Sequence, residues 1–229
     1  GAEEAYLNMA VDEAVSRAVE SGQAAPTIRF YTWTAPAVSI GAFQPLREVN
    51  IDRCKEKNIP VVRRITGGRA LLHQDELTYS VICPIPSPFF PSNLQGCCRI
   101  IAEALQLGLR QIGLELQIFP QKAYRPSKPH PPDCFSTPSL YELTADGRKL
   151  VGSAQRRTAR ALLQQGSLLL GPAHLRLADF LAIPDPAREP VRAGLDQASA
   201  HAGRWLGFRP PLARGADARQ AELPPDTRR

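Results

Sequence analysis

Short β-type segments follow one another along most of the chain between Pro26 and Leu170, and this order of elements constrains the fold more than any other feature. Apolar and β-branched runs such as 60–66 and 161–170 alternate with turn residues. Helical patterns occur at 6–22 and 93–113, and 50–58 reads as a short polar helix. Many neighbouring strands with a few interspersed helices favour an α+β or mixed α/β fold, in which a mixed β-sheet is flanked by helices.

The periodicity of each segment gives further expectations. One side of the first helix should carry Leu7, Ala10, Val11, Ala14, Val15 and Ala18. One side of the second should carry Cys98, Ile101, Ala102, Leu105 and Leu109, which makes Cys98 a packing residue. Segments 26–33 and 37–43 read as a strand pair. Segment 139–158 reads as a hairpin through Asp146-Gly147, a favoured two-residue turn.

The length of 229 residues suits one large domain or two small ones. Beyond Ala187 the composition shifts towards Ala, Arg, Pro, Gly and Asp, so we expect a catalytic domain at 1–190 and a partly flexible C-terminal extension at 191–229. No apolar run approaches the roughly 18 residues that cross a bilayer, and the first 15 residues are too acidic for a signal peptide. A cytoplasmic location away from membranes is the expectation.

The cysteines, histidines and net charge limit the classes of partner. Five cysteines show no CxxC spacing, Cys97 and Cys98 are adjacent, and four histidines are scattered, so we expect reduced thiols and no metal site. The net charge of +6 implies attraction to acidic partners. The basic residues are not gathered into a block with interleaved aromatics, which argues against nucleic acid.

The stretch RRITGGRALLH, residues 63–73, is the most informative motif. A glycine pair directly after a strand lets the backbone approach a ligand closely, because no Cβ is in the way. Three arginines surround the pair, and His73 reads either as a satisfied strand histidine or as a pocket wall. The alternative is a tight turn in a basic hairpin, and the stretch lacks the spacing of a Walker A loop.

The stretch GRKLVGSAQRR, residues 147–157, places a lysine just past a turn. Such a lysine is usually a solvated surface charge. Here Lys149 is followed by the small residues Gly152, Ser153 and Ala154, which leave open space beside the strand. A lysine that faces such a cleft can lower the pKa of a neighbouring thiol or move a proton.

Cys134 lies in the run YRPSKPHPPDCFSTPS, whose prolines and small polar residues cannot form a core element. A free cysteine has a pKa near 8.5. Basic residues close in sequence could lower it, namely Lys122, Arg125, Lys128, Arg148 and Lys149. Local features do not favour a nucleophile over an inert loop thiol.

Together these segments resemble the biotin/lipoate A/B protein ligase superfamily and, within it, the LipM-type octanoyl-[acyl-carrier-protein]:protein N-octanoyltransferases. The likeness covers about residues 6–185, from NMAVDEAV through RRITGGRALLH and CFSTPSLYEL to GRKLVGSAQRR. It implies the biotin/lipoate protein ligase catalytic-domain fold, with an acyl slot beside the glycine pair. The substrate-binding residues it implies are Arg63, Arg64, Gly67, Gly68, Arg69, Ala70, His73, Gly152, Ser153 and Ala154.

The resemblance also implies a mechanism for protein lipoylation. Cys134, followed by Phe135, would carry an acyl thioester, and Lys149 would lower its pKa, with a general-base role as a hypothesis. The donor would be octanoyl-acyl carrier protein, and the acceptor a lysine of a lipoyl domain or of the glycine-cleavage H protein. Neither ATP nor another cofactor is implied, the enzyme is expected to be a monomer, and the basic surface would steer acidic partners.

Three other functions remain open at this point. An ATP-dependent lipoate–protein ligase would use the glycine pair and Lys149 to hold a lipoyl-adenylate, with no need for Cys134. An octanoyl-H-protein:protein amidotransferase would use a similar cysteine route. A non-catalytic scaffold would only bind lipoyl domains.

Overall fold

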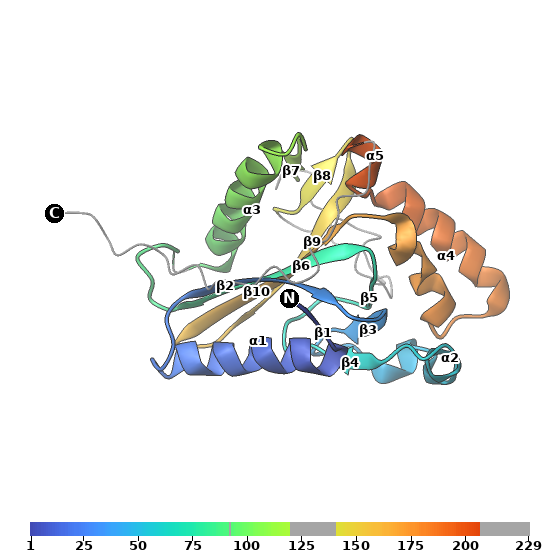
Figure 1. Ribbon diagram of the computed structural model, residues 1–229, viewed down its shortest axis with the longest axis horizontal. Coiled ribbons are helices and arrows are strands. Elements are labelled where there is room, and N and C mark those ends of the chain that lie inside the picture. Colours follow the sequence, from blue (N-terminus) through green and yellow to red (C-terminus); the bar gives the residue numbers. More distant parts are fainter. Residues whose placement is uncertain (92, 120–140, 207–229) are drawn as a thin grey trace.

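The computed structural model describes residues 1–91, 93–119 and 141–206, which are built around a seven-stranded sheet (Figure 1). Its strands, in spatial order, are β1 (Ala2–Glu3), β2 (Thr27–Trp33), β6 (Glu76–Pro84), β10 (Ala161–Leu169), β9 (Arg148–Arg157), β8 (Leu143–Ala145) and β7 (Gln117–Ile118). β1 is parallel to β2, and the other neighbours pair antiparallel. A three-stranded sheet contains β4 (Val61–Arg63), β3 (Ala37–Ile40) and β5 (Leu71–His73).

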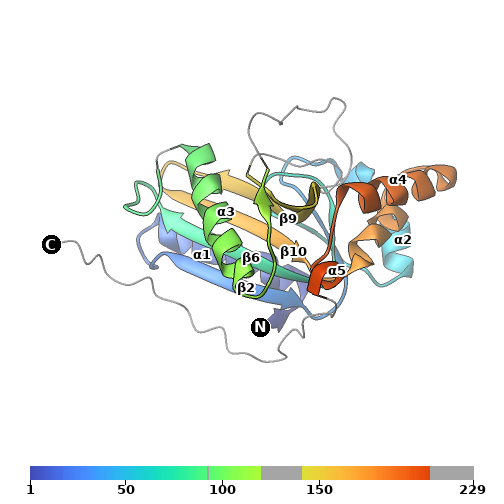
Figure 2. The same ribbon diagram turned by 90° about the horizontal axis from the view of Figure 1, so that it is seen from above.

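Helices cover both faces of the large sheet. α1 (Ala5–Glu20) lies on one face and α3 (Leu94–Arg110) on the other, as Figures 1 and 2 show. The small sheet packs with α2 (Ile51–Glu56), the 3₁₀ helix η3 (Pro172–Phe180) and α4 (Asp185–Ala198), while η1 (Leu46–Glu48) and α5 (Gly203–Leu206) are short. A mixed sheet flanked by helices confirms the predicted fold class.

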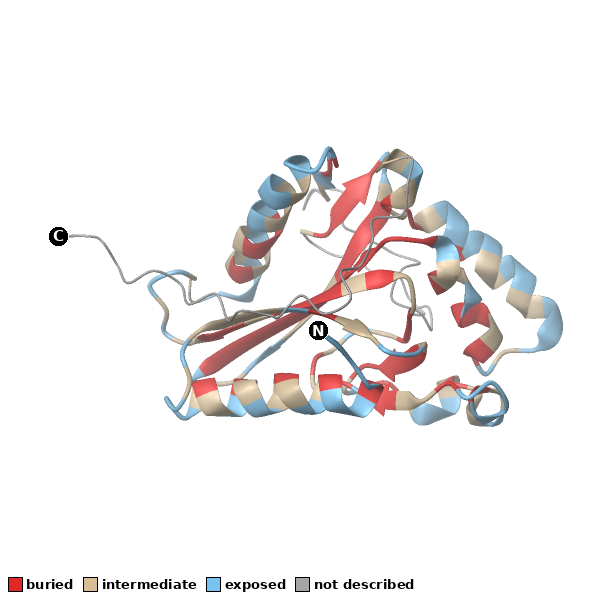
Figure 3. Cartoon of the chain, viewed as in Figure 1, coloured by how far each residue is buried: buried red, intermediate tan, exposed pale blue. Residues whose placement is uncertain are grey.

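The central strand β10 is buried along its whole length (Figure 3). Because both faces of the sheet are covered, such a strand should read as a nearly continuous apolar run. Residues 161–170 follow this pattern except at Gln164, Gln165 and Ser167, which are buried polar side chains. Buried polar groups need hydrogen-bond partners, so these three residues mark the part of the sheet where a polar network must lie.

Helix α1 is confirmed, but the apolar side identified from the spacing is not the side that it buries. Leu7 is 47% exposed, and the helix instead buries a polar stripe that contains Asn8, Asp12 and Ser16. These residues are four apart and therefore share one face. The stripe can be buried because hydrogen-bond partners on the sheet compensate the lost hydration.

The expected pairing of segments 26–33 and 37–43 is also wrong. Both edges of β2 are occupied, one by β1 and the other by β6, so β3 joins the separate small sheet between β4 and β5. The hairpin of β8 and β9 is confirmed. Its turn residues Asp146 and Gly147 have φ angles of +48° and +75°, the left-handed conformation that this turn requires.

In α3 the burial of the two adjacent cysteines differs from the expectation. Cys97 is fully buried against Cys83 and Leu162, whereas Cys98 is only partly buried. The helix is rotated so that Cys97, Ile101 and Ala102 form its buried side. Cys98 is therefore free to line a cavity, described below.

The expected domain boundary at residue 190 falls inside α4. Leu195 of that helix belongs to the core cluster of the small sheet, and Ala200 and Ala202 pack in the core cluster of the large sheet. The chain up to Leu206 is thus part of one packed unit, and 207–229 lie outside the described residues. Within the described ranges, no helix has both the length and the hydrophobicity to cross a membrane.

Candidate active site

A cavity of about 400 Å³ opens between the Gly67-Gly68 turn, the start of α3 and strand β9. Its size falls in the range of small-molecule sites. The lining residues are Gly67, Gly68, Leu94, Gln95, Cys98, Tyr141, Glu142, Ser153, Ala154, Gln155 and Gln164. The structure thus brings together the glycine pair and the small-residue run of β9, which are more than 80 positions apart in the sequence.

The glycine turn is fixed by arginine side chains that bond to backbone carbonyls. Arg64 donates to the carbonyl oxygens of Gly67 and Arg69, both at 2.8 Å, and also to Ser39 Oγ at 2.9 Å. Arg63 donates to the carbonyls of Gly41 and Gln44, both at 2.8 Å. Both guanidinium groups therefore hold the loops on either side of the turn.

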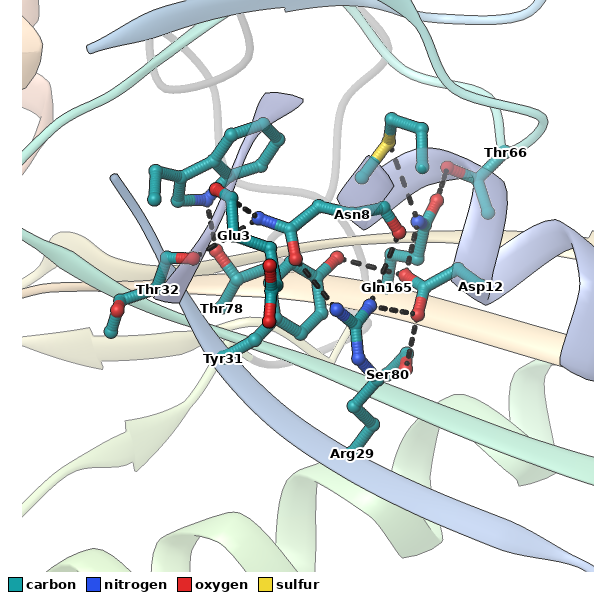
Figure 4. A network of polar contacts seen from close by, with 12 residues as sticks. Glu3, Asn8, Asp12, Arg29, Tyr31, Thr32, Thr66, Thr78, Ser80 and Gln165 are labelled. Carbon is teal, nitrogen blue, oxygen red and sulfur yellow. Dashed lines mark hydrogen bonds and ion pairs between the residues drawn. The ribbon is translucent and has the colours of Figure 1, made fainter. Parts of the chain in front are cut away.

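A second support reaches the turn from α1 through the centre of the sheet (Figure 4). Asp12 is fully buried, and its carboxylate accepts hydrogen bonds of 2.7–2.9 Å from Arg29, Tyr31, Ser80 and Gln165. Gln165 in turn accepts a bond of 2.7 Å from Thr66 Oγ1, directly before Gly67. Desolvation by burial and the Asp12 carboxylate raise the pKa of Tyr31 well above its ordinary value, so Tyr31 remains a donor.

The backbone of Gly41 lies very close to the backbone of the Gly67-Gly68 turn. A Cβ built on Gly41 would lie 2.0 Å from the carbonyl oxygen of Gly68, whereas a Cβ on Gly67 would meet nothing within 4 Å. We expect Gly41→Ala to lower the free energy of unfolding by about 2–3 kcal/mol, since a packed backbone carbonyl cannot move cheaply. Thermal unfolding should show the loss for Gly41→Ala and not for Gly67→Ala; equal melting temperatures for the two variants would contradict the close approach.

Lys149 is held by an unanticipated partner, Glu142. Its Nζ lies 2.6 Å from Glu142 Oε1, and the two side chains are 1% and 2% exposed. Lys149 is on β9 opposite Thr144 of β8, and its carbonyl accepts from the Ala200 amide at 2.9 Å, so the backbone is anchored on both sides. The preceding Tyr141 has a φ of +62°, a strained conformation for a non-glycine residue that is typical of functional sites.

Further polar side chains continue from this pair: Ser153, Gln155 and Gln164 line the cavity, and the buried Tyr79 contacts two of them. The Ser153 amide lies 3.4 Å from Glu142 Oε1, and the Ser153 hydroxyl lies 2.7 Å from Tyr79 OH. Tyr79 OH also accepts from Gln164 at 2.8 Å, and Gln164 accepts from Gln155 at 2.5 Å. Desolvation raises the pKa of Tyr79 to about 12, so this hydroxyl stays protonated at neutral pH.

A smaller recess of about 30 Å³ shares Ser153 and Ala154 with the cavity. Predicted residues Arg64, His73 and Gly152 line it. His73 stacks on Trp33 with a ring separation of 3.9 Å, and its ring nitrogens lie 2.6 Å from Glu76 Oε1 and 2.7 Å from Ser39 Oγ.

Glu76, a buried carboxylate, contacts the recess-lining residues His73, Thr78 and Ser167. Burial alone would raise its pKa, but His73 and the hydroxyls of Thr78 and Ser167 outweigh burial and hold the pKa below its ordinary value. His73 therefore has a fixed orientation in the wall of the recess, with a charged partner on one side.

The remaining predicted residues lie in different surroundings. Arg69 forms an ion pair of 2.5 Å with Glu48, and Ala70 is fully buried in the core cluster of the small sheet. Cys134 lies outside the described residues. Among those that are described, no group of three His, Cys, Asp or Glu side chains is arranged to hold a metal ion.

The other four cysteines are poor nucleophiles. Burial raises the pKa of Cys54 and Cys98 to about 11 and that of Cys83 to about 12, and it also raises the pKa of Cys97. A thiol needs to lose its proton to attack a thioester. At neutral pH these four side chains are therefore neutral thiols, including Cys98 in the cavity wall.

Sequence reasoning missed Asp12, Glu142 and Gln165 as parts of the site. Two signals were present in the sequence. Polar residues repeat at four-residue spacing on the first helix, and two glutamines interrupt the apolar run 161–170. Glu142 carried no such signal, because its partner is decided by how the following hairpin folds.

Comparison with known proteins shows the family. Residues 4–201 match the lipoyl protein ligase A/B catalytic domain. The chain is similar to the octanoyltransferase LipM of Exiguobacterium sp., with 41% identity over 81% of this chain and 69% of that protein. The LipM protein of Staphylococcus aureus is 44% identical over 74% of this chain and 63% of its own length. The LipM protein of Moorella thermoacetica is 40% identical over 85% of this chain and 71% of its own length. The chain thus spans about two thirds of the length of these relatives.

Two solved lipoate ligases have the same architecture as this chain. The bipartite lipoate protein ligase of Thermoplasma acidophilum, studied with its E2 lipoyl domain, has a TM-score of 0.69 and 25% identity, covering 87% of this chain and 70% of that one. Lipoate-protein ligase A bound with ATP has a TM-score of 0.60 and 26% identity, and the match covers 87% of this chain and 80% of the ligase chain. The chain therefore belongs to the lipoyl protein ligase A/B catalytic domain family and, within it, to the LipM octanoyltransferases.

Proposed function

We propose that this chain transfers an octanoyl group from octanoyl-acyl carrier protein to a lysine of a lipoyl domain or of the glycine-cleavage H protein, through a thioester on Cys134. The observation that carries the proposal is the cavity between the glycine turn and β9, whose wall includes Glu142, the ion-pair partner of the buried Lys149. A cationic group beside a cavity of this size can stabilise a thiolate that enters it.

The choice of Cys134 is supported by the other cysteines and by its place in the sequence. The four described cysteines are neutral thiols at neutral pH, for the reason given above. Cys134 is seven positions before Tyr141, which lines the cavity.

The reaction consists of two balanced steps. The Cys134 thiolate attacks the carbonyl carbon of the donor thioester, a new C–S bond forms, and the carrier's thiolate leaves and is protonated. The neutral ε-amine of the acceptor lysine then attacks the acyl-enzyme, so that the amide forms, the C–S bond breaks and the amine's proton passes to a base. Exchange of thioesters is nearly neutral and thioester to amide is downhill, so ATP is not needed.

The proposed partners fit the charge of the chain and one structural relative. The net charge of +6 favours acidic carrier and lipoyl domains by electrostatic steering. A ligase with 25% identity was studied together with its E2 lipoyl domain, which supports a lipoyl-domain acceptor. We further propose that the enzyme acts as a monomer in the cytoplasm.

The test is mass spectrometry of the intact protein after incubation with octanoyl-acyl carrier protein, followed by peptide mapping. The expected result is one octanoyl adduct, on Cys134, that disappears when an acceptor lipoyl domain is added. An adduct on Cys98, or lipoyl-domain modification that requires ATP and free acid, would contradict the proposed route.

A further inference from the structure

Lys149 is placed differently from a surface lysine that reaches freely into a cleft. Its side chain is 1% exposed, and its ammonium lies 2.6 Å from a carboxylate that is itself 2% exposed. An ammonium is strongly hydrated, so its burial disfavours the charged form unless an opposite charge compensates. The charge state of Lys149 therefore depends on what surrounds it, and the Glu142 carboxylate is in direct contact with it.

Glu142 links Lys149 to the cavity. It lines the cavity, and its Oε1 faces both Lys149 Nζ and the Ser153 amide. Its backbone is fixed as well, since its carbonyl accepts from the Phe119 amide at 2.8 Å. The following β8–β9 hairpin then returns Lys149 to the same place, so the two side chains meet through a rigid connection.

We propose that Glu142 is the positioning residue of the site: it keeps Lys149 protonated and aimed, so that the buried pair, rather than Lys149 alone, sets the reactivity of the attacking thiol. The inference rests on the proposed function for the identity of that thiol. Glu142 acts through Lys149, with no bond to the substrate required.

The direction in which the pKa of Cys134 should shift follows from the opposite charges of Lys149 and Glu142. When Glu142 is replaced by glutamine, Lys149 stays buried but loses the negative charge that lies 2.6 Å from its ammonium, so its pKa falls. A neutral Lys149 no longer favours the thiolate, and the pKa of Cys134 rises towards the ordinary cysteine value. If Glu142 instead acted directly on the thiol, removing its negative charge would lower that pKa, so the two explanations predict opposite directions.

Burial favours the neutral form of four titratable groups near the pair within the described part of the chain. On α3, desolvation raises the pKa of Cys98 to about 11, and on β6 it raises the pKa of Tyr79 to about 12. In η3, His174 contacts Ser199, which is bridged to Lys149, and burial lowers the pKa of His174 to about 4. Burial also lowers the pKa of the nearby His201. The comparison of Glu142→Gln with the Lys149→Met background, rather than a single pH profile, assigns a shift to Lys149.

The experiment measures the rate of acyl-enzyme formation in a single turnover as a function of pH. We expect Glu142→Gln to move the acid limb of the profile up by about one pH unit, which makes acylation about tenfold slower at pH 7. Glu142→Asp keeps the negative charge, so the acid limb of its pH profile should lie at the same pH as that of the wild type. Glu115→Gln, on an exposed surface ion pair, should behave as wild type in every respect.

The Lys149→Met variant serves as the background that distinguishes a positioning role of Glu142 from a purely structural role. There, adding Glu142→Gln should cause no further shift of the limb, because the residue through which Glu142 acts is gone. Removing both members of the buried ion pair costs less than removing one, so the double variant tests the idea even if Glu142→Gln alone folds poorly. An unchanged limb in folded Glu142→Gln, a shift to lower pH, or an equal shift in the Lys149→Met background would each overturn the inference.

The outcome also distinguishes this inference from the proposed function. If the wild type forms no acyl-enzyme on Cys134 at any pH, the proposed function fails. If the wild type is acylated there and Glu142→Gln keeps its profile, only the role of Glu142 fails.

Discussion

Replacing Cys134 with alanine is expected to reduce octanoyl transfer from acyl carrier protein by on the order of 10³-fold or more, because the covalent intermediate can no longer form. The described cysteines cannot substitute for it, since burial keeps them protonated at neutral pH. The measurement is octanoylation of a lipoyl domain, followed by mass spectrometry over time. The matched control is Cys54→Ala, a core thiol on α2 away from the cavity, which should retain transfer.

The same variant distinguishes a transferase from a ligase. A ligase would activate free lipoate or octanoate with ATP and would need no cysteine, and solved ligases share the fold of this chain. Cys134→Ala should therefore be inactive with the carrier-bound donor, and neither it nor the wild type should use free acid with ATP. Retained transfer in Cys134→Ala would exclude the thioester route.

Replacing Asp12 with alanine is expected to lower the free energy of unfolding by about 3–5 kcal/mol. The variant leaves the buried donors of Tyr31, Ser80 and Gln165 without their shared acceptor, and it also removes the counter-charge 2.8 Å from the partly buried Arg29 guanidinium. For a domain of this size, the melting temperature should fall on the order of 10 °C. Thermal and urea unfolding monitored by circular dichroism would measure the loss.

The control for Asp12 is its neighbour Glu13, on the same helix. Glu13 pairs with Arg17 at 2.5 Å, but the Glu13 side chain is 36% exposed and that of Arg17 is 76% exposed, so solvent screens the pair. Glu13→Ala should therefore cost less than about 1 kcal/mol. A similar small loss for both variants would mean that the Asp12 network does not stabilise the sheet.

Much of the fold and part of the site could be predicted from local sequence. The Asp146-Gly147 turn, the strand 161–169 and the helix 94–110 follow from turn chemistry and periodicity, which act over a few residues. The glycine pair and the small-residue run of β9 were also identified, and the structure brings both to one cavity. The role of Cys134 stays a prediction.

The buried side of α1 and the place of β3 could not be predicted in this way. Apolar spacing selected Leu7 and its neighbours, yet the helix buries the stripe containing Asp12. Single-segment periodicity has no information on whether a polar residue will find partners elsewhere. Likewise, β2 and β3 are adjacent in sequence, but β2 has both edges paired with β1 and β6.

The sequence by itself determined the helices, the strands, the hairpin and the motifs of a lipoyl ligase-type domain, because each depends on residues close along the chain. Only the tertiary structure decided that Thr66, Gln165 and Asp12 form one support for the glycine turn, since these residues lie on three separate segments. It also decided that Lys149 has Glu142 as its counter-charge. A buried charge is set by its surroundings, and those surroundings exist only once the sheet has assembled.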